Sequence, residues 1–423
     1  MTEARQSGSR FAVATMFALF FVIAFVTNFG GSMGVVVKNQ FGASNTASQL
    51  GSAANFFAYL FMGIPGGLIL GRRGYKFTIL LATFVGFVGV GIQLISGFLC
   101  SFPVYVTGAF VAGFAMCLLN LVVNPLLNTL GGGGNGGNRL VQFGSSFNSV
   151  GGTLAPVLLG YLIGGEVSAA KVADVTPVMM IAMAIFVLAF AVVAFSRIPE
   201  PHLETTEERQ TRRTAGSSVW NDVLRTLGCR HFTLGAVAMF LYIVIEFGIP
   251  STALLYMTES GKPWYVGAAV AGSVGGAYCL FMMFGRVLGG CIGSKVSARH
   301  MVAVCAAVAI GLLLAIMCLP LQMVEIAGTR LPVSMVLVAV CGLCTSVMWG
   351  GIFNLATEGL GRYVPIGSGI FMTMCVGGIL LPMQGWVADG VGILNSYWFT
   401  VVLLAYVLYY AVAGSRISRR GGE

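Results

Sequence analysis

The chain has 423 residues, of which 57% are hydrophobic and only 9% are charged. A soluble globular domain with this balance could not cover its surface with polar groups, so the composition excludes that class. The formal net charge of +9 would fit a nucleic-acid partner only if the cations gathered on one surface, but they are spread over separate loops. We therefore expect an integral membrane protein in a lipid bilayer, with no nucleic-acid partner.

Long apolar runs predict membrane-spanning helices throughout the sequence. Residues 11–37 contain no Asp, Glu, Lys or Arg, and residues 77–138 contain none either. A span needs about 20 apolar residues, so the first run fits one span and the second fits two. Lipid offers the backbone no hydrogen bonds, which predicts helices, and a β-barrel would show alternation instead. In chain order, we expect helices at residues 11–37, 46–70, 77–98, 103–129, 140–164, 175–197, 231–257, 265–292, 301–324, 332–356, 366–388 and 394–414.

The loop cations predict how these helices are oriented. Most of them, including Arg72, Arg139 and Arg362, fall in one set of alternate loops. The opposite set carries only Lys38, Lys171, Lys262 and Arg330. Cytoplasmic loops are enriched in Lys and Arg, so both termini are predicted to be cytoplasmic. Residues 1–10 and the run after them do not resemble a cleavable signal, so we expect a multi-pass protein of the bacterial inner membrane with its first helix retained.

Repeated landmarks predict two related halves. Asn124 and Leu130-Gly131 correspond to Asn354 and Leu360-Gly361, and a basic residue and a Gly-Ser pair follow in each half. Two further glycines and a proline, Gly151, Gly152 and Pro156 or Gly377, Gly378 and Pro382, then follow in the same order. A parallel duplication predicts a substrate site near the bilayer midplane, at the bundle interface. We expect an N-terminal six-helix bundle over residues 1–197, a cytoplasmic linker over 198–230 and a C-terminal six-helix bundle over 231–423.

Amide side chains on the first, fourth and fifth helices are candidate substrate ligands. Asn120, Asn124 and Asn128 are four residues apart and therefore share one helix face. Amides supply donors and acceptors without charge, which recognition of hydroxyl groups requires. Hydrogen bonding between helices is the alternative role of this stripe. Asn28 and Asn148 complete this group of candidates.

Among the 14 acidic residues, Glu246 is the one expected well inside a span. An ionised carboxylate at a helix centre costs about 2.5–3.5 kcal/mol, so Glu246 should be protonated, face a wet cavity or bind a ligand. A substrate- or proton-binding role and a neutral structural role both fit. No embedded Lys or Arg is expected to pair with it, because Arg286 is near the cytoplasmic end of its helix. Tyr242 lies one turn before Glu246, and Gly248 and Pro250 interrupt the helix just beyond, as at transporter binding sites.

Two more candidates lie on the tenth and eleventh predicted helices. Trp349 is suited to stacking on the apolar side of a sugar, although a packed aromatic is an equal alternative. Gln384 offers a further neutral amide. Anionic substrates normally require Arg or Lys in the cavity, and none is expected at mid-membrane. This favours a neutral polar cargo.

Little in the sequence indicates catalysis. The three histidines fall in or beside cytoplasmic loops, and no metal or nucleophile constellation accompanies them. Cys341 and Cys344 form a CxxC pair inside an apolar helix, without further ligands nearby. The glycines of residues 131–137 lack the following Lys-Ser/Thr of a phosphate cradle and are interpreted as a flexible connector. We expect neither enzymatic activity, with no catalytic residue, nor a metal or other cofactor.

Short motifs extend along the chain from the first helix to the last. They include Asn124-Pro125, Phe147-Asn148-Ser149, Phe240-Leu-Tyr242 with Glu246, Gly285-Arg286 and Pro382-x-Gln384-Gly385. Together they resemble the major facilitator superfamily and, within it, the fucose, galactose and glucose permeases that are proton symporters. The resemblance implies an all-α membrane fold of two six-helix bundles, a rocking mechanism of alternating access, and sugar held by polar side chains of helices 4, 5, 7, 10 and 11.

The same resemblance favours a conformational gate at the turn between the second and third helices. Gly71, Arg72, Arg73 and Lys76 stand at this turn, and Arg286 lies near the corresponding end of the eighth helix. A generic packing turn is the alternative. The Asp that usually precedes the Arg in the superfamily is absent here.

The sequence also departs from the permeases at their proton-coupling acids. Gly30-Gly31 and Asn120 stand where the resemblance places acids on helices 1 and 4, so Glu246 is the remaining candidate for proton coupling. We expect a secondary active transporter for a small neutral polar solute, favouring a monosaccharide, with proton symport through Glu246. The alternatives are an uncoupled facilitator or an exporter of another polar solute and, outside transport, a transporter-like nutrient sensor.

Overall fold

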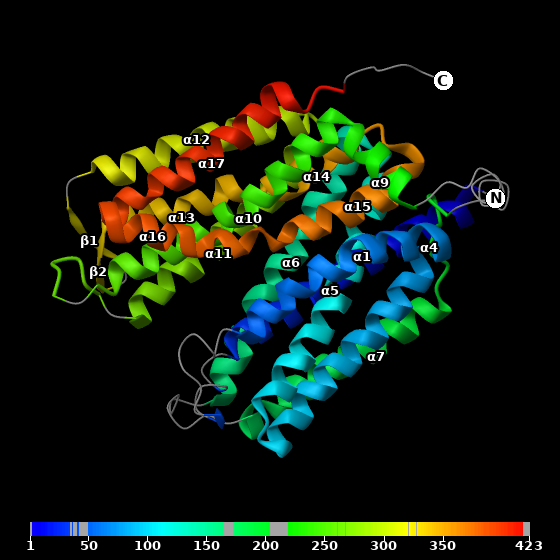
Figure 1. The fold of residues 1–423 in the computed structure, drawn as a ribbon, viewed down its shortest axis with the longest axis horizontal. Helices are drawn as coiled ribbons and strands as arrows, with labels where there is room; N and C mark the ends of the chain where they lie inside the picture. The colour runs from blue at the N-terminus through cyan, green and yellow to red at the C-terminus, as the bar shows by residue number, and fades with distance from the viewer. Residues whose placement is uncertain are drawn as a thin grey trace. The chain divides into compact units, whose positions relative to one another are not determined.

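Long helices make up most of the computed structural model of this chain (Figure 1). The structure describes residues 2–33, 36, 40–41, 50–163, 172–203, 219–259, 261–266, 268–319, 321–326 and 328–417. The start of the predicted second span and residues 204–218 of the predicted linker lie outside these ranges. The first helices are α1 (Thr2–Ser32), α4 (Leu50–Leu99), α5 (Phe102–Leu130), α6 (Gly134–Ile163), α7 (Val172–Phe195) and α9 (Val219–Gly228).

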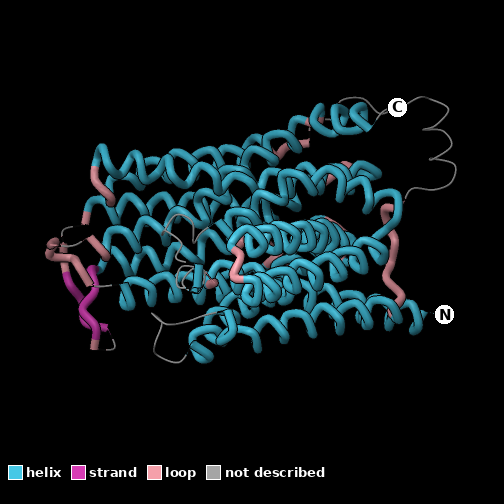
Figure 2. The backbone as a smooth tube through the Cα atoms, turned by 60° about the horizontal axis from the view of Figure 1, so that its bottom comes forward, coloured by secondary structure: helices cyan, strands magenta, loops and turns pink. Residues whose placement is uncertain are grey.

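The later part of the chain is also helical, with more interruptions. Its helices are α10 (Arg230–Met257), α11 (Ala268–Ile292), α12 (Ala298–Cys318), α13 (Val333–Ser346), α14 (Met348–Thr357), α15 (Val364–Thr373), α16 (Leu381–Val391) and α17 (Tyr397–Tyr409). Short turns of other helix types are η2 (Gly361–Tyr363), η3 (Met374–Leu380), η4 (Leu394–Ser396) and η5 (Tyr410–Gly414). Strands β1 (Met323–Ile326) and β2 (Thr329–Pro332) form one antiparallel hairpin (Figure 2).

The helices have the length and composition of membrane spans. Ten segments of the described residues qualify, and the one within α4 covers 47 residues, Ala53–Leu99. This length is enough for two spans. Gly74, with φ 83° and ψ 178°, divides α4 between the predicted second and third spans. The all-α membrane fold expected from the apolar runs is therefore confirmed.

Several predicted boundaries are wrong. The first helix was expected to begin at residue 11, but α1 begins at Thr2. The ninth span was expected to reach residue 324, but α12 ends at Cys318. Leu319 precedes a proline, and the residue before a proline disfavours the α conformation. The glycine-rich connector is also shorter than expected, because α6 already begins at Gly134. Gly132 and Gly133 make the turn before it with φ values of 83° and 71°, which glycine adopts without strain.

The helices group into two compact units. Unit 1 comprises Met1–Leu130, Phe147–Thr226 and Leu360–Thr373, and unit 2 comprises Gly131–Ser146, Leu227–Gly359 and Met374–Glu423. The chain therefore crosses between the units five times: after Leu130, after Ser146 within α6, after Thr226, after Gly359 and after Thr373. The bundles at 1–197 and 231–423, with the linker between them, stay a prediction from the sequence repeat.

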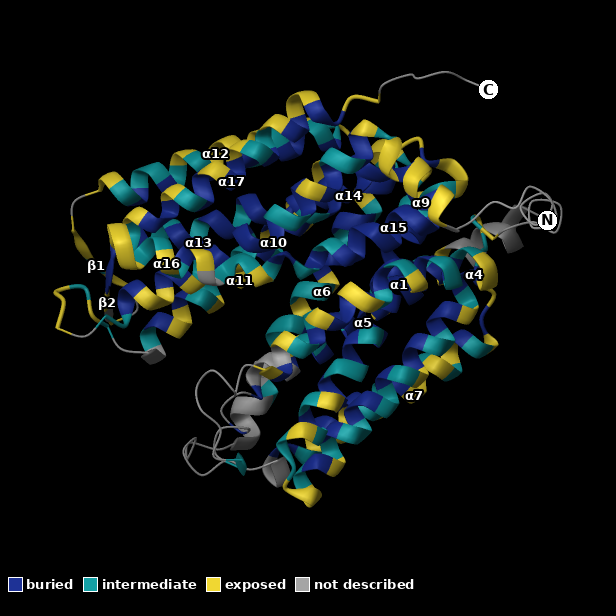
Figure 3. Cartoon of the chain, in the orientation of Figure 1, coloured by how far each residue is buried: buried dark blue, intermediate teal, exposed yellow. Residues whose placement is uncertain are grey.

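In unit 1, α4 is the helix with the most neighbours, packing against α5, α7 and α15. Glycines bring α4 and α15 together. A Cβ on Gly67 would lie 2.5 Å from the carbonyl oxygen of Pro365, and a Cβ on Gly369 would lie 2.5 Å from that of Gly63. Small residues of this kind allow close backbone approach in membranes. The exposed side of α7 carries apolar side chains such as Leu188 and Phe195, which suits contact with lipid (Figure 3).

In unit 2, α10 is central and packs against η3, α14, α17 and α11. The first half of α6 also belongs to this unit and lies along α11. A Cβ on Gly293, in the turn after α11, would lie 3.3 Å from the Cα of Arg139, and a Cβ on Gly290 of α11 would lie 2.8 Å from the Phe143 ring. The glycines of α11 thus serve the same purpose as those of α4.

Candidate functional site

An acid and a guanidinium meet inside unit 2. Nη2 of Arg286 on α11 lies 3.5 Å from Oε1 of Glu246 on α10, and only 9% and 15% of these side chains are exposed. The prediction that no embedded cation pairs with Glu246 is therefore wrong. The backbone of Arg286 is near the end of its span, but its side chain is long enough to reach from there to the Glu246 carboxylate deeper in the span. A buried charge usually has such a partner.

The proline in α10 explains a further contact of Glu246. Pro250 has no N–H, so the backbone carbonyl of Glu246, four residues earlier, loses its helical donor. The hydroxyl of Tyr278 on α11 donates to this carbonyl instead, at 3.3 Å. The Tyr278 hydroxyl also lies 2.8 Å from the hydroxyl of Thr345 on α13. Tyr278 was not among the sequence-based candidates, although a tyrosine in an apolar helix was an available signal.

Two aromatic candidates lie beside this group. The hydroxyl of Tyr242 donates to the backbone carbonyl of Thr345 at 3.2 Å. Its ring packs edge-on against Trp349 of α14, with centroids 6.3 Å apart. Tyr242 is fully buried whereas Trp349 is half-buried. The structure therefore brings Tyr242, Glu246 and Trp349 together, as a shared site requires.

Gln384 on α16 is buried against α17 and α10. Its amide nitrogen donates to the Thr400 hydroxyl at 3.0 Å. A Cβ on Gly248 of α10 would lie 2.5 Å from its Oε1, so the glycine makes room for the amide. Among the described residues, Oε1 has no hydrogen-bond donor. Gln384 thus lies next to the interruption of α10 that the Gly/Pro pattern predicted.

The asparagine stripe of α5 lies inside unit 1. The Asn120 amide donates to the Tyr59 hydroxyl of α4 at 3.2 Å and to the carbonyl of Met116 at 3.1 Å. The Asn124 amide donates to the carbonyl of Asn120 at 3.0 Å. Both asparagines are buried, whereas Asn128 is half-buried. Asn120 and Asn124 therefore contribute to packing within unit 1, whatever else they bind.

Asn28 and Asn148 lie on neighbouring helices of the same unit. The Asn148 amide on α6 donates to the carbonyl of Phe20 on α1 at 3.4 Å. The Asn28 amide donates to the carbonyl of Ala24 at 2.9 Å, and Gly152 of α6 lies against it. Asn28 is exposed and Asn148 is half-buried.

The predicted gating residues surround the break in α4. A Cβ on Gly71 would lie 3.5 Å from the Pro365 side chain. Nζ of Lys76 donates to two carbonyls at the end of α7, Ala194 at 2.8 Å and Ser196 at 2.9 Å. Arg73 stacks over the ring of Phe77, and Arg72 lies on the same turn.

An acid absent from the predictions completes this turn. The carboxylate of Glu200 accepts hydrogen bonds from the backbone N–H groups of Lys76, at 2.8 Å, and of Tyr75. Burial raises the pKa of Glu200 from its ordinary value, while these two N–H donors and the nearby Lys76 charge lower it. Nearby, the Tyr75 hydroxyl lies 2.6 Å from Nδ1 of His202, whose pKa is lowered by burial. Glu200 thus brings a carboxylate to a turn that lacks the superfamily's usual Asp.

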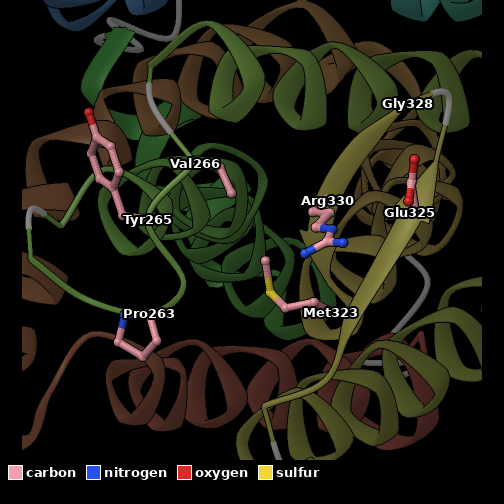
Figure 4. A pocket seen from close by; sticks show the side chains of 7 residues that line it. All are labelled: Pro263, Tyr265, Val266, Met323, Glu325, Gly328 and Arg330. Atoms are coloured by element: carbon pink, nitrogen blue, oxygen red, sulfur yellow. The ribbon is translucent and has the colours of Figure 1, made fainter.

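A cavity of about 750 Å³ lies apart from all of these residues, between the 261–266 loop and the β1–β2 hairpin (Figure 4). Arg330 and Met323 of the hairpin extend toward its middle, and Tyr265 and Val266 border it on the loop side. Its lining residues are exposed or half-buried. None of the sequence-based candidates lines this cavity.

Comparison with known proteins identifies relatives along nearly the whole chain. The sequence profile of the Major Facilitator Superfamily matches residues 15–382. A glucose/galactose transporter of Brucella abortus is 28% identical, over 97% of this chain and 96% of that protein. An L-fucose-proton symporter of Escherichia coli is 24% identical, over 90% of this chain and 87% of that protein.

Solved structures show the same fold. The crystal structure of the transporter FucP in the outward conformation aligns with a TM-score of 0.81 and 20% identity, covering 94% of this chain and 97% of that one. The proton:xylose symporter XylE aligns with a TM-score of 0.66 and 16% identity. At these identities the likeness concerns the fold alone.

Proposed function

This chain belongs to the Major Facilitator Superfamily, and from this premise we propose that it carries a neutral monosaccharide across the bacterial inner membrane by alternating access. The observation behind this cargo class is the similarity, along 97% of the chain, to a protein named as a glucose/galactose transporter. The candidate side chains fit such a cargo, because amides and hydroxyls bond sugar hydroxyls and aromatic rings stack on their apolar sides.

The charge balance in unit 2 supports a neutral cargo. An anionic substrate would need a free cation, but Arg286 is matched by Glu246 at 3.5 Å. A site without net charge favours a sugar or polyol over nitrate or phosphate. The pairing of Arg286 with Glu246 thus favours a neutral solute even though a cation lies inside unit 2.

Proton symport through Glu246 is the second part of the proposal. Glu246 lies inside a span, with a guanidinium nitrogen of Arg286 3.5 Å from its carboxylate. In this position the side chain can either be ionised and paired with Arg286 or bind a proton and become neutral. An L-fucose-proton symporter is among the relatives. An uncoupled facilitator or exporter is the alternative, and it predicts no response to a pH gradient.

We also propose that both termini are cytoplasmic. The proposed gate is the turn of α4 formed by Gly71, Arg72, Arg73 and Lys76, together with Arg286 on α11. Lys76 binds this turn to the end of α7 by donating hydrogen bonds to two backbone carbonyls. By contrast, α4 meets α15 through glycines. Such a contact consists of close packing, which can separate and re-form as a conformational gate requires.

Uptake into proteoliposomes tests the proposed function. Purified protein is supplied with labelled glucose, galactose, fucose and xylose, and with gluconate as an anionic comparison, with and without an inward pH gradient. We expect one or more neutral sugars to accumulate above equilibrium only with the gradient. Equilibration without accumulation would support a facilitator, and uptake of gluconate alone would overturn the cargo class.

A further inference from the structure

Helix α9 follows one membrane span in the chain and ends directly before the next. Only Cys229 separates Gly228, the last residue of α9, from Arg230, the first of α10. The φ and ψ angles of Cys229, −76° and 104°, are extended, so α9 is a helix of its own and no continuation of the span. The 28 residues of α10 cover about 42 Å, which matches a bilayer of about 40–45 Å with its head groups. The end of α9 therefore lies close to the lipid head groups.

One face of α9 is apolar and exposed. Trp220, Leu224 and Leu227 follow one another at intervals of four and three residues, so they share this face, which we call the apolar stripe. Their exposed fractions are 65%, 63% and 38%. Exposed apolar side chains on a helix beside a membrane are typical of helices that lie in the interface between water and lipid. Trp220 strengthens this preference, because the ring of a tryptophan is apolar while its N–H can bond the head groups.

A second face attaches α9 to unit 1. Asp222, Val223 and Thr226 lie on this face and are buried. The Thr226 hydroxyl donates to the backbone carbonyl of Asp222 at 2.7 Å. The apolar stripe lies on a different side of the helix, so it is not the surface by which α9 packs against the protein.

The third face of α9 is polar, and its charge is positive. Asn221, Arg225 and Gly228 share this face and are exposed. The only acid within α9, Asp222, lies on the buried face instead. Arg230 follows at the start of α10 and is exposed as well. Cations therefore border the apolar stripe, where they complement the negative charge of anionic lipids.

We propose that α9 docks on the anionic phospholipids of the adjoining leaflet, with the apolar stripe among the acyl chains and Arg225 beside the phosphates. With both termini cytoplasmic, as proposed above, this leaflet is the cytoplasmic one, which carries anionic lipids. The adjacent span and the bordering cations favour lipid over a second copy of the chain as the occupant. The inference depends on neither the cargo nor the proton coupling.

Quenching by brominated lipid tests whether Trp220 enters the bilayer. Full-length wild type and Trp220→Phe are reconstituted in vesicles of phosphatidylcholine and phosphatidylglycerol, with or without phosphatidylcholine brominated near the head-group end of its acyl chains. The difference in fluorescence between the two proteins reports Trp220, because the other tryptophans are common to both. We expect brominated lipid to at least halve this difference and aqueous iodide to leave most of it. Quenching by iodide but not by brominated lipid would overturn the proposal.

Hydrogen–deuterium exchange in nanodiscs tests the helix as a whole. Each disc holds one copy of the full-length protein, so a second copy cannot cover α9. In discs with phosphatidylglycerol, we expect Leu224→Gln to speed the exchange of peptides covering residues 219–228 several-fold. Leu224 is exposed, and Gln forms helices about as well as Leu, so the fold should tolerate the change. Asn221→Gln on the polar face is the matched control, and equal exchange in the two variants would contradict docking through the apolar stripe.

The lipid composition of the discs tests the charge. In wild type, the same peptides should exchange several-fold more slowly with phosphatidylglycerol than in phosphatidylcholine alone. Arg225→Gln should remove most of this difference, whereas Arg225→Lys should retain it because it keeps the charge. Tyr363→Phe is the control, since it removes the hydroxyl to which Arg225 donates at 3.5 Å but leaves the cation. Equal wild-type exchange in both lipids, or a loss in Tyr363→Phe as large as in Arg225→Gln, would overturn the role of anionic lipid.

Discussion

Units 1 and 2 use the same packing device but differ in their buried polar chemistry. Each has a row of glycines along one helix: Gly63, Gly67 and Gly71 on α4, and Gly285 and Gly289 on α11, with Gly293 in the turn that follows it. The polar groups do not repeat in this way. Unit 1 buries neutral amides at Asn120 and Asn124, whereas unit 2 buries Glu246 with Arg286.

This difference separates a packing device found in both units from a polar chemistry found in one of them. Close helix approach depends on the backbone, and both units have glycines at such contacts. Charged chemistry carries a desolvation cost in the membrane, and in the described residues the buried pair of Glu246 and Arg286 lies in unit 2. We therefore expect sugar recognition to involve both units, and proton coupling to depend on unit 2 alone.

The largest effect should come from Glu246→Gln in unit 2. The amide keeps the shape of the side chain but cannot exchange a proton, so accumulation driven by a pH gradient should fall by more than about tenfold, or about 1.4 kcal/mol. Exchange of labelled for unlabelled sugar should persist. The measurement is uptake in proteoliposomes with Glu246→Asp as the control. Undiminished accumulation in Glu246→Gln would show that coupling resides elsewhere.

A second prediction concerns the shared packing device. Gly67→Val in unit 1 and Gly289→Val in unit 2 both insert atoms into close contacts, since a Cβ on Gly289 would already lie 2.7 Å from Val347. Overpacking of this kind costs about 1–3 kcal/mol, and transport should fall with it. Gly272→Val is the control, because a Cβ there meets no atom within 4 Å.

Comparable losses in both units, measured as thermal stability and sugar exchange, would support the shared role of the glycines. A Gly67→Val variant that behaves like Gly272→Val would show that unit 1 does not depend on its close glycine contact. Both substitutions change packing without altering any charged residue.

The sequence predicted the helices more completely than the side-chain partners. Charge-free apolar runs identified the spans, and the position of Glu246 within one of them made it a candidate for proton or substrate binding. Its partner was missed because an arginine side chain is long, and the sequence locates only its backbone. Glu200 was missed for a related reason: its contact with the turn at Lys76 depends on how distant segments fold together, which no local pattern records.

The third prediction tests the neutral chemistry of unit 1. Asn120→Leu removes the donor to the Tyr59 hydroxyl, which should cost about 0.5–1.5 kcal/mol. It should also weaken the protection that bound sugar gives against thermal unfolding. Asn128→Leu, on the same helix face but half-buried, is the control. Full protection by sugar in Asn120→Leu would assign Asn120 to packing alone.

The smallest effect concerns the turn beside α4, outside the spans. Burial lowers the pKa of His202 in the folded protein, so the unfolded chain binds a proton more readily. Stability should therefore fall as the pH drops from the ordinary value of about 6.5 through the lowered folded value. His202→Gln should lack this dependence, which thermal unfolding at about pH 8 and about pH 5.5 would measure. His300→Gln, at an exposed position, serves as the control, and equal pH slopes for wild type and His202→Gln would contradict the account.

Sugar-induced proton movement tests the central claim most directly. Unlabelled sugar is added to de-energised, lightly buffered proteoliposomes while the external pH is recorded. We expect external alkalinisation with wild-type protein and Glu246→Asp, and none with Glu246→Gln, although sugar still enters. Sugar entry without any pH change in the wild type, or alkalinisation that persists in Glu246→Gln, would contradict it.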